Sequence, residues 1–285
     1  MALNTFFKRR SPSEADMSFV DHLEALRWHL FRMVVYVATA GVIIFVKIDW
    51  IFDTIIRGPI RKDFISYTAL CRFGHWVGAG DALCMPAVDT ELQSTAFGSM
   101  FMTSINIAIF GGLIVAAPFV FWELWKFIKP ALTTKEVKNT RGAVAFVSGF
   151  FLLGVAFGYF LLAPFTFSFL SNYKLGLSNV MLVRPTLDDY IETMIDIIIG
   201  CGLAFELPVA AFVLTKIGLI TASFLRNYRK YAIVIILVVA AVITPSPDWM
   251  SQAIVTIPLW LLYEFSILVA ARVQKEEEQK EKEWS

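Results

Sequence analysis

The sequence predicts an all-α polytopic membrane protein built from six transmembrane helices. Of its 285 residues, 57% are hydrophobic and 17% are charged, whereas charged residues make up about 25% of an ordinary soluble domain. Apolar runs long enough to cross a hydrocarbon core of roughly 30 Å, which takes about 20 helical residues, recur along the chain. The net charge of +1, spread over short blocks between these runs, gives no indication of nucleic-acid binding.

Six apolar segments are candidate spans, and the first four are long. The fifth has thirteen apolar residues between Tyr231 and Ile243, and the sixth contains Pro258, so this pair crosses only where the bilayer is thinned or neighbouring helices shelter it. A re-entrant hairpin is the alternative for the pair, and it leaves the C-terminus on the same side. We place the spans at residues 28–48, 97–121, 143–169, 191–217, 231–245 and 252–271.

The distribution of basic residues predicts the side on which each loop lies. Seventeen Lys and Arg residues flank one set of span ends and seven flank the other, and cytoplasmic loops retain positive charge. We therefore expect a cytoplasmic N-terminal segment of residues 1–27, a membrane domain of residues 28–271, and a cytoplasmic charged tail of residues 272–285. The N-terminal segment lacks the apolar run of a signal peptide. The tail is expected to be a solvated helical extension or a disordered end.

Residues 49–96 form an outside loop that is too long to be a bare connection, so we expect it to carry short helices. It contains Cys71 and Cys84, thirteen residues apart. In an oxidising compartment these two can form a disulfide, and two free thiols are the alternative. Cys201 lies in the fourth span and has no partner in the sequence.

No signature of a soluble enzyme is present. The chain has no glycine-rich phosphate loop, no G-x-S-x-G and no H-E-x-x-H, and His22, His29 and His75 do not form a metal-ligand spacing. We therefore predict no enzymatic activity, no cofactor and no metal. Gly154 and Gly158 have the G-x-x-x-G spacing, which we interpret as close helix packing within the monomer.

Glu206 lies in the fourth span, close to the middle of the bilayer. An ionisable side chain at that depth costs about 2.5–3.5 kcal/mol, so we expect it to face protein, a partner or a water-filled cavity. Pro208 removes a backbone donor and is expected to kink the helix beside the carboxylate. The alternative is a protonated Glu206 bonded to a neighbouring helix. Asp196, nearer the outer end of this span, is expected at the membrane interface.

Several strings at the span ends resemble one family in order and spacing, over about residues 17–272. They are FVDHLEALRWHLFR at 19–32, APFVFWELWKFIKPALTTKE at 117–136, FELPV at 205–209, RNYRKYAI at 226–233 and TPSPDWMSQ at 244–252. Together they resemble TatC, the polytopic subunit of the twin-arginine protein translocase. The resemblance implies a concave, glove-like receptor in the bacterial inner membrane that binds twin-arginine signal peptides of folded proteins. It also implies single-span TatA and TatB partners, an oligomeric complex and transport driven by the proton-motive force.

The resemblance implies that acidic residues on the cytoplasmic face recognise the signal peptide, because carboxylates accept the guanidinium fork bidentately. Glu136 matches one family acid, and Phe127 and Pro130 match the pattern of the same segment. At the second recognition position this chain has Ala25. The adjacent Glu24, about 100° round the helix, either substitutes for the missing acid or is a first-turn acid favoured by the helix dipole. For Glu136, the alternative is an ordinary loop acid balanced by neighbouring lysines.

Four further positions match the family and are expected mainly to shape the fold: Pro59 in the outer loop, Pro118 in the second span, Asp248 between the last two spans, and Glu264 in the sixth. Glu264 is expected to pair with Arg272 or with an adjacent helix. The resemblance also implies that Glu206 lies inside the concave face and contacts partner subunits.

Two competing functions stay open. One is a proton-coupled transporter in which Glu206 and Asp196 relay protons, although no inverted repeat is visible in the sequence. The other is a membrane scaffold with the same fold but without signal recognition, which Ala25 keeps open.

Overall fold

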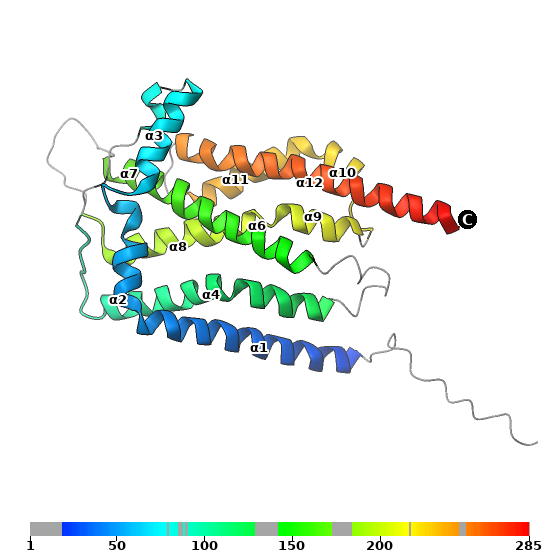
Figure 1. Ribbon diagram of the computed structural model, residues 1–285, viewed down its shortest axis with the longest axis horizontal. Helices are drawn as coiled ribbons and strands as arrows, with labels where there is room; N and C mark the ends of the chain where they lie inside the picture. The colour runs from blue at the N-terminus through cyan, green and yellow to red at the C-terminus, as the bar shows by residue number, and fades with distance from the viewer. Residues whose placement is uncertain are drawn as a thin grey trace, which may run out of the picture.

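The chain is almost entirely helical (Figure 1). The computed structural model describes residues 19–78, 80–84, 88, 91–128, 142–172, 184–216, 218–244 and 249–284. Within these residues there is no β-strand, and Gln93 and Thr186 form an isolated bridge. The predicted all-α membrane class is confirmed. The α-helices are α1 (Phe19–Val46), α2 (Ile48–Ile51), α3 (Ile65–Val77), α4 (Ser99–Ile128), α6 (Ala143–Phe157), α7 (Ala163–Asn172), α8 (Leu187–Ala204), α9 (Leu207–Lys216), α10 (Ala222–Asn227), α11 (Arg229–Ile243) and α12 (Trp249–Trp284).

Five helical segments are long and apolar enough to cross a membrane, and they coincide with the predicted first, second, third, fourth and sixth spans. The fourth begins at Leu187 instead of 191, because the side chain of Thr186 accepts a hydrogen bond from the Asp189 N–H at 3.2 Å and caps the helix. The segments are Glu24–Val46, Ser99–Phe127, Val144–Asn172, Leu187–Lys216 and Gln252–Glu276.

The predicted fifth span is the short helix α11. Its 15 residues measure about 22 Å, less than the roughly 30 Å of a hydrocarbon core. It packs against α12, where the Gln252 amide donates to the Leu237 carbonyl oxygen at 3.2 Å. The number of helices that qualify as spans is therefore five in the described residues, one fewer than predicted. The helix α12 continues through Pro258 into the charged tail.

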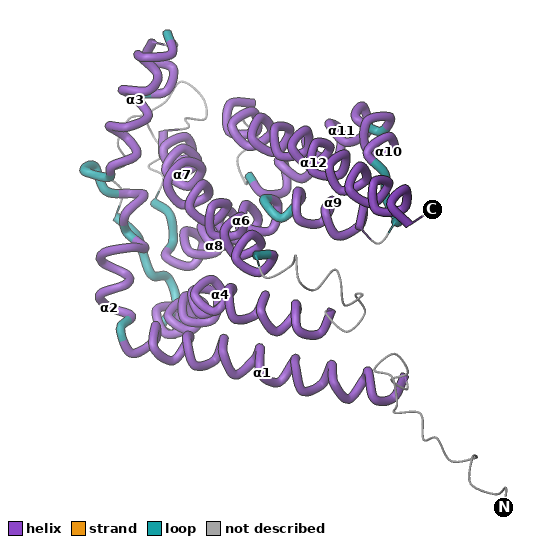
Figure 2. Tube along the Cα trace, turned by 45° about the vertical axis from the view of Figure 1, so that its right-hand side comes forward, coloured by secondary structure: helices purple, strands orange, loops and turns teal. Residues whose placement is uncertain are grey.

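The helices run lengthwise, so that the start of α1 and the end of α12 lie at the same end of the bundle, which we call the terminal side (Figure 1). The helix α3 lies at the opposite end, which we call the α3 side (Figures 1 and 2). Residues 1–18 and 285 lie outside the described residues.

Close approach of the helices depends on glycine at two contacts. A Cβ atom at Gly112 of α4 would lie 2.8 Å from the Gly41 nitrogen of α1, and one at Gly154 of α6 would lie 2.5 Å from the Cys201 carbonyl oxygen of α8. A Cβ at Gly158 would meet the Ile197 carbonyl oxygen at 3.1 Å. Within the monomer, the G-x-x-x-G pair thus packs α6 against α8.

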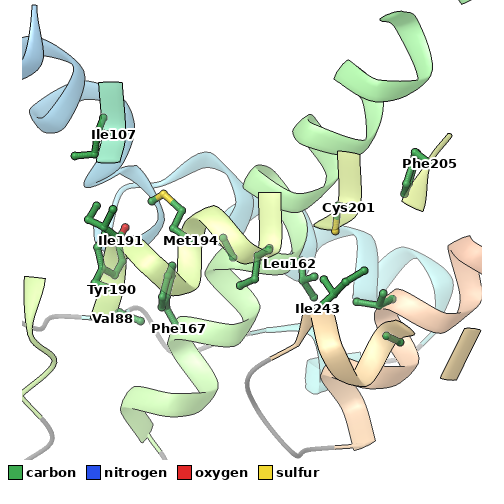
Figure 3. Packing of buried hydrophobic residues seen from close by; sticks show 14 of the residues in the cluster. Val88, Ile107, Leu162, Phe167, Tyr190, Ile191, Met194, Cys201, Phe205 and Ile243 are labelled. Carbon is green, nitrogen blue, oxygen red and sulfur yellow. The ribbon is translucent and has the colours of Figure 1, made fainter. Parts of the chain in front are cut away.

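The apolar core is centred on α8. Figure 3 shows Met194 of α8, Leu162 of the turn between α6 and α7 and Ile243 of α11 in one buried cluster, and each is at most 6% exposed. Burial of such side chains contributes about 1.5–3 kcal/mol each. The core therefore joins the third, fourth and fifth predicted spans.

The outer segment carries short helices, as the sequence predicts. After α2, a π-helical turn (Phe52–Ile56) and a 3₁₀ turn (Gly58–Ile60) precede α3, and a 3₁₀ turn (Gly80–Leu83) follows it. The segment is tied to the bundle through main-chain oxygens. The Tyr159 hydroxyl donates to the Ile55 carbonyl at 2.7 Å, and the Tyr190 hydroxyl to the Ile56 carbonyl at 2.6 Å.

Pro59 lies in this segment and is almost fully buried. The hydroxyl of Tyr67 in α3 donates to the Pro59 carbonyl oxygen at 2.6 Å. Burial raises the pKa of Tyr67 to about 12, so the phenol keeps its donor proton throughout the neutral range.

Candidate functional site

A buried carboxylate lies near the terminal side, between α1 and α4. Glu123 of α4 has a side chain only 1% exposed. One oxygen, Oε2, lies 2.7 Å from His29 Nδ1 and 3.4 Å from Arg32 Nη1, both on α1. The other, Oε1, accepts a hydrogen bond from Lys126 Nζ at 2.8 Å. These four residues are called the Glu123 cluster below.

Helix geometry accounts for the cluster. His29 and Arg32 are three residues apart on α1, and Glu123 and Lys126 three apart on α4, so each pair shares one helix face. Arg32 and Lys126 are about half exposed, while Glu123 is enclosed. A buried charge requires such partners, because removing one of them leaves an uncompensated ion. The cluster therefore fixes the register of α1 against α4 near their terminal-side ends.

Phe127 is in contact with this cluster. Its ring lies edge-to-face against the His29 ring, with centroids 6.1 Å apart. The structure thus brings a residue of the predicted recognition segment beside the entry motif of α1. Glu136 and Pro130 fall in residues 129–141, and Asp248 falls in residues 245–248. Both stretches lie outside the described residues.

Ala25 lies on the face of α1 that carries the cluster. Ala25 precedes His29 by four residues and Arg32 by seven, so it shares their helix face. Glu24, one residue earlier, lies about 100° away round the helix. Glu24 is exposed and makes no hydrogen bond with another described residue. Helix α1 begins at Phe19, so Glu24 and Ala25 both lie within its first turns, and a role of Glu24 in place of the missing acid stays a prediction.

Glu206 lies at a break in the fourth span. Helix α8 ends at Ala204 and α9 begins at Leu207, and the Glu206 N–H donates to the Leu203 carbonyl oxygen at 3.1 Å. The cause is Pro208, because its ring excludes the carbonyl four residues earlier, that of Ala204, and it has no N–H to donate. Pro208 itself is almost fully buried.

The Glu206 carboxylate has no partner in the described part of the chain. Both of its oxygens are buried, and neither has a hydrogen bond to any described group. A bond from Glu206 to a neighbouring helix is thus not found among these residues. An unpaired buried carboxylate is costly, so Glu206 is an acceptor for which the described residues supply no donor.

The remaining predicted residues occupy separate places. The Arg229 guanidinium of α11 donates to Glu264 of α12 at 2.6 Å, so Glu264 pairs with an adjacent helix. Pro118 lies within α4, which continues through it. Asp196 is exposed and lines a cavity of about 560 Å³ between α4 and α8 together with Asp188 and Glu192.

On the α3 side, the structure joins Cys71 and Cys84 by a disulfide. Cys201 is free and buried.

Sequence reasoning missed the importance of Glu123. In the sequence it is only an acid near the recognition segment, because two of its three partners, His29 and Arg32, lie more than ninety residues earlier in the chain. The available signal was an acid inside the end of an apolar run, three residues before a lysine.

Residues 21–258 match the family model "Sec-independent protein translocase protein (TatC)". Among relatives, the TatC protein of Blattabacterium sp. subsp. Periplaneta americana is 37% identical, over 91% of this chain and 97% of its own. That of Deinococcus radiodurans is 33% identical, over 96% and 94%. A crystal structure of the twin-arginine translocase receptor TatC, 29% identical, covers 89% of this chain and 99% of its own with a TM-score of 0.67. The chain therefore belongs to the TatC family of Sec-independent protein translocase proteins.

Proposed function

We propose that this chain is the receptor subunit of a Sec-independent translocase and binds twin-arginine signal peptides at its terminal side. The observation that carries the proposal is the contact of Phe127 with His29 beside buried Glu123. This contact brings together the two segments that resemble the family's recognition motifs, although they are about ninety residues apart.

In this proposal Glu136 is the main recognition acid, and Glu24 is a weaker contributor. The Glu123 carboxylate is already bonded to three basic side chains, so it has little capacity left for a guanidinium. Its role is to hold α1 and α4 in place. Pro130 and Phe127 then support the segment that carries Glu136.

We place the terminal side in the cytoplasm and the α3 side outside the bacterial inner membrane. The excess of Lys and Arg on one set of flanks supports this orientation. Both ends of the described chain lie at one end of the bundle (Figure 1), which fits six crossings when the short helix α11 is counted with the five longer spans.

We further propose that Glu206 is the contact for single-span partners of the TatA and TatB type. The support is the helix break with two unpaired carboxylate oxygens. A polar side chain of a partner helix can supply the missing donor once the Glu206 side chain turns out of its buried position. Proton relay from Asp196 is less well supported, because ten residues separate the two carboxyl groups, roughly 15 Å along a helix.

The test is binding of signal peptides that carry Arg-Arg or Lys-Lys to the purified full chain. Wild type is expected to prefer Arg-Arg. A charge-assisted hydrogen bond contributes about 1.5–3 kcal/mol, so Glu136→Gln should weaken Arg-Arg binding about tenfold or more. Glu24→Gln should have a smaller effect, and Ala25→Glu should strengthen binding.

Glu91→Gln, an exposed acid remote from the terminal side, is the matched control. If Glu136→Gln binds both peptides as wild type does, the recognition role is wrong. If wild type itself does not distinguish the peptides, the scaffold without signal recognition is the better description, as Ala25 would favour.

A further inference from the structure

A group of metal-ligating side chains lies on the α3 side, away from the Glu123 cluster and from Glu206. His75 Nε2 lies 3.7 Å from Cys84 Sγ and 3.2 Å from Asp81 Oδ1. One ligand atom from each of Cys71, His75 and Cys84 falls within 4.8 Å of the others. The two sulfurs and the imidazole nitrogen thus form one group, and the Asp81 carboxylate lies beside the imidazole.

The backbone brings these groups together. Cys71 and His75 are four residues apart in α3, one turn of the same face. The helix ends at Gly78 with a positive φ of 78°, and Gly80 follows with a φ of 56°, conformations that residues with a side chain rarely adopt. The 3₁₀ turn Gly80–Leu83 then returns the chain toward α3. There the Cys84 N–H donates to the Asp81 carbonyl oxygen at 2.9 Å.

The donor set is that of a structural zinc site. Zinc takes thiolate, imidazole and carboxylate ligands in a tetrahedron, with Zn–S of about 2.3 Å and Zn–N of about 2.0 Å, so that neighbouring ligand atoms lie roughly 3.3–3.8 Å apart. The distance from His75 Nε2 to Cys84 Sγ, 3.7 Å, falls within that spacing, and the distance to Asp81 Oδ1, 3.2 Å, lies just below it. The two sulfurs, bonded to each other in the disulfide, would have to separate, and the exposed Asp81 side chain would have to turn toward them.

An ion can reach the site from solvent. The side chains of His75 and Asp81 are 57% and 88% exposed, and α3 projects from the bundle (Figures 1 and 2). The two cysteines are half-buried.

We propose that the reduced form of this segment is a zinc site with Cys71, His75, Asp81 and Cys84 as ligands. A dithiol reductant transfers two electrons and two protons to the Cys71–Cys84 bond, giving two thiols, and itself becomes a disulfide. Zn²⁺ then displaces the two thiol protons and binds both thiolates. The same loop is thus closed in two ways, by a covalent bond when oxidised and by zinc when reduced.

The test uses the full chain in detergent with Cys201→Ala, so that the only thiols are those of the site. After reduction with a phosphine and its removal without air, zinc is titrated against a chromophoric chelator. One zinc per reduced chain is expected and none per oxidised chain. Cys71→Ser should abolish binding. His75→Ala and Asp81→Asn should weaken zinc binding by at least about tenfold, because the loss of an outer-shell partner alone lowers metal affinity by about 10- to 100-fold.

Asp63→Asn, an exposed acid of the same outer segment that pairs with Arg61, is the matched control and should bind zinc as the parent does. Cobalt in place of zinc gives a second readout, because thiolate-to-cobalt absorption bands report sulfur ligands directly. The proposal is overturned if the reduced chain takes up no zinc, if the oxidised chain binds it equally, or if His75→Ala leaves the affinity unchanged.

Discussion

At the scale of single residues, the carboxylates of Glu123 and Glu206 have opposite surroundings. Glu123 is surrounded by three basic groups, whereas the oxygens of Glu206 have no hydrogen-bond partner in the described part of the chain. A paired buried acid stabilises helix packing, while an unpaired one reduces stability and leaves an acceptor for another molecule. The two residues therefore respond to substitution in different ways.

Replacement of Glu123 should destabilise the fold. Glu123→Ala leaves His29 and the two basic partners without an acceptor, and we expect a loss of about 2–4 kcal/mol, near the range for breaking a buried pair. Lys126→Ala, which removes a half-exposed partner, should cost about 1 kcal/mol or less. Thermal unfolding of the detergent-solubilised chain measures both. Equal losses in the two variants would contradict the role assigned to Glu123.

Replacement of Glu206 should have effects of opposite sign on stability and on partner binding. Glu206→Leu removes an unpaired polar group, so the isolated chain should unfold at a higher temperature. The same variant should capture less of a single-span partner in co-purification, while Glu206→Gln should keep part of the binding because its amide still forms hydrogen bonds. Unchanged capture by Glu206→Leu would rule out the proposed partner contact.

At the scale of elements, hydropathy predicts the long helices well because a span is a local property. It does not predict where they end. The start of α8 depends on the Thr186 cap. The break before α9 depends on the clash between the Pro208 ring and the Ala204 carbonyl group. The Glu123 cluster depends on the register of α1 against α4, and the group of Cys71, His75 and Cys84 depends on two glycine turns. Neither can be derived from residue spacings alone. The spacing between histidines does not reveal the group around His75, because its neighbours are Asp81 and the two cysteines.

The short helix α11 gives a prediction at this scale. If α11 crosses the membrane, residue 246 lies on the same side as α3. Ser246→Cys, in a Cys201→Ala background, should then react with an impermeant maleimide added to the α3 side of intact cells, as should Thr68→Cys in α3, which is exposed. If α11 instead forms a re-entrant hairpin with α12, residue 246 is shielded. Labelling of Thr68→Cys alone would contradict the crossing.

At the scale of the whole molecule, the family and the helical architecture could be predicted from the sequence, whereas the pairing of residues across helices could not. The motif strings gave the recognition segments, but Ala25 departs from the pattern and Glu136 lies outside the described residues. Near the terminal side, the chain holds α1 and α4 through charge. On the α3 side, it holds the outer segment through hydroxyl groups.

This second attachment determines which substitutions the outer segment tolerates. Tyr159 and Tyr190 donate to the main-chain oxygens of Ile55 and Ile56, and every amino acid offers such an oxygen. Residues 55 and 56 can therefore change their side chains without losing the attachment, whereas a tyrosine replaced by phenylalanine loses its bond at once. Positions 55 and 56, which accept the bonds, are therefore expected to vary more than Tyr159 and Tyr190, which donate them.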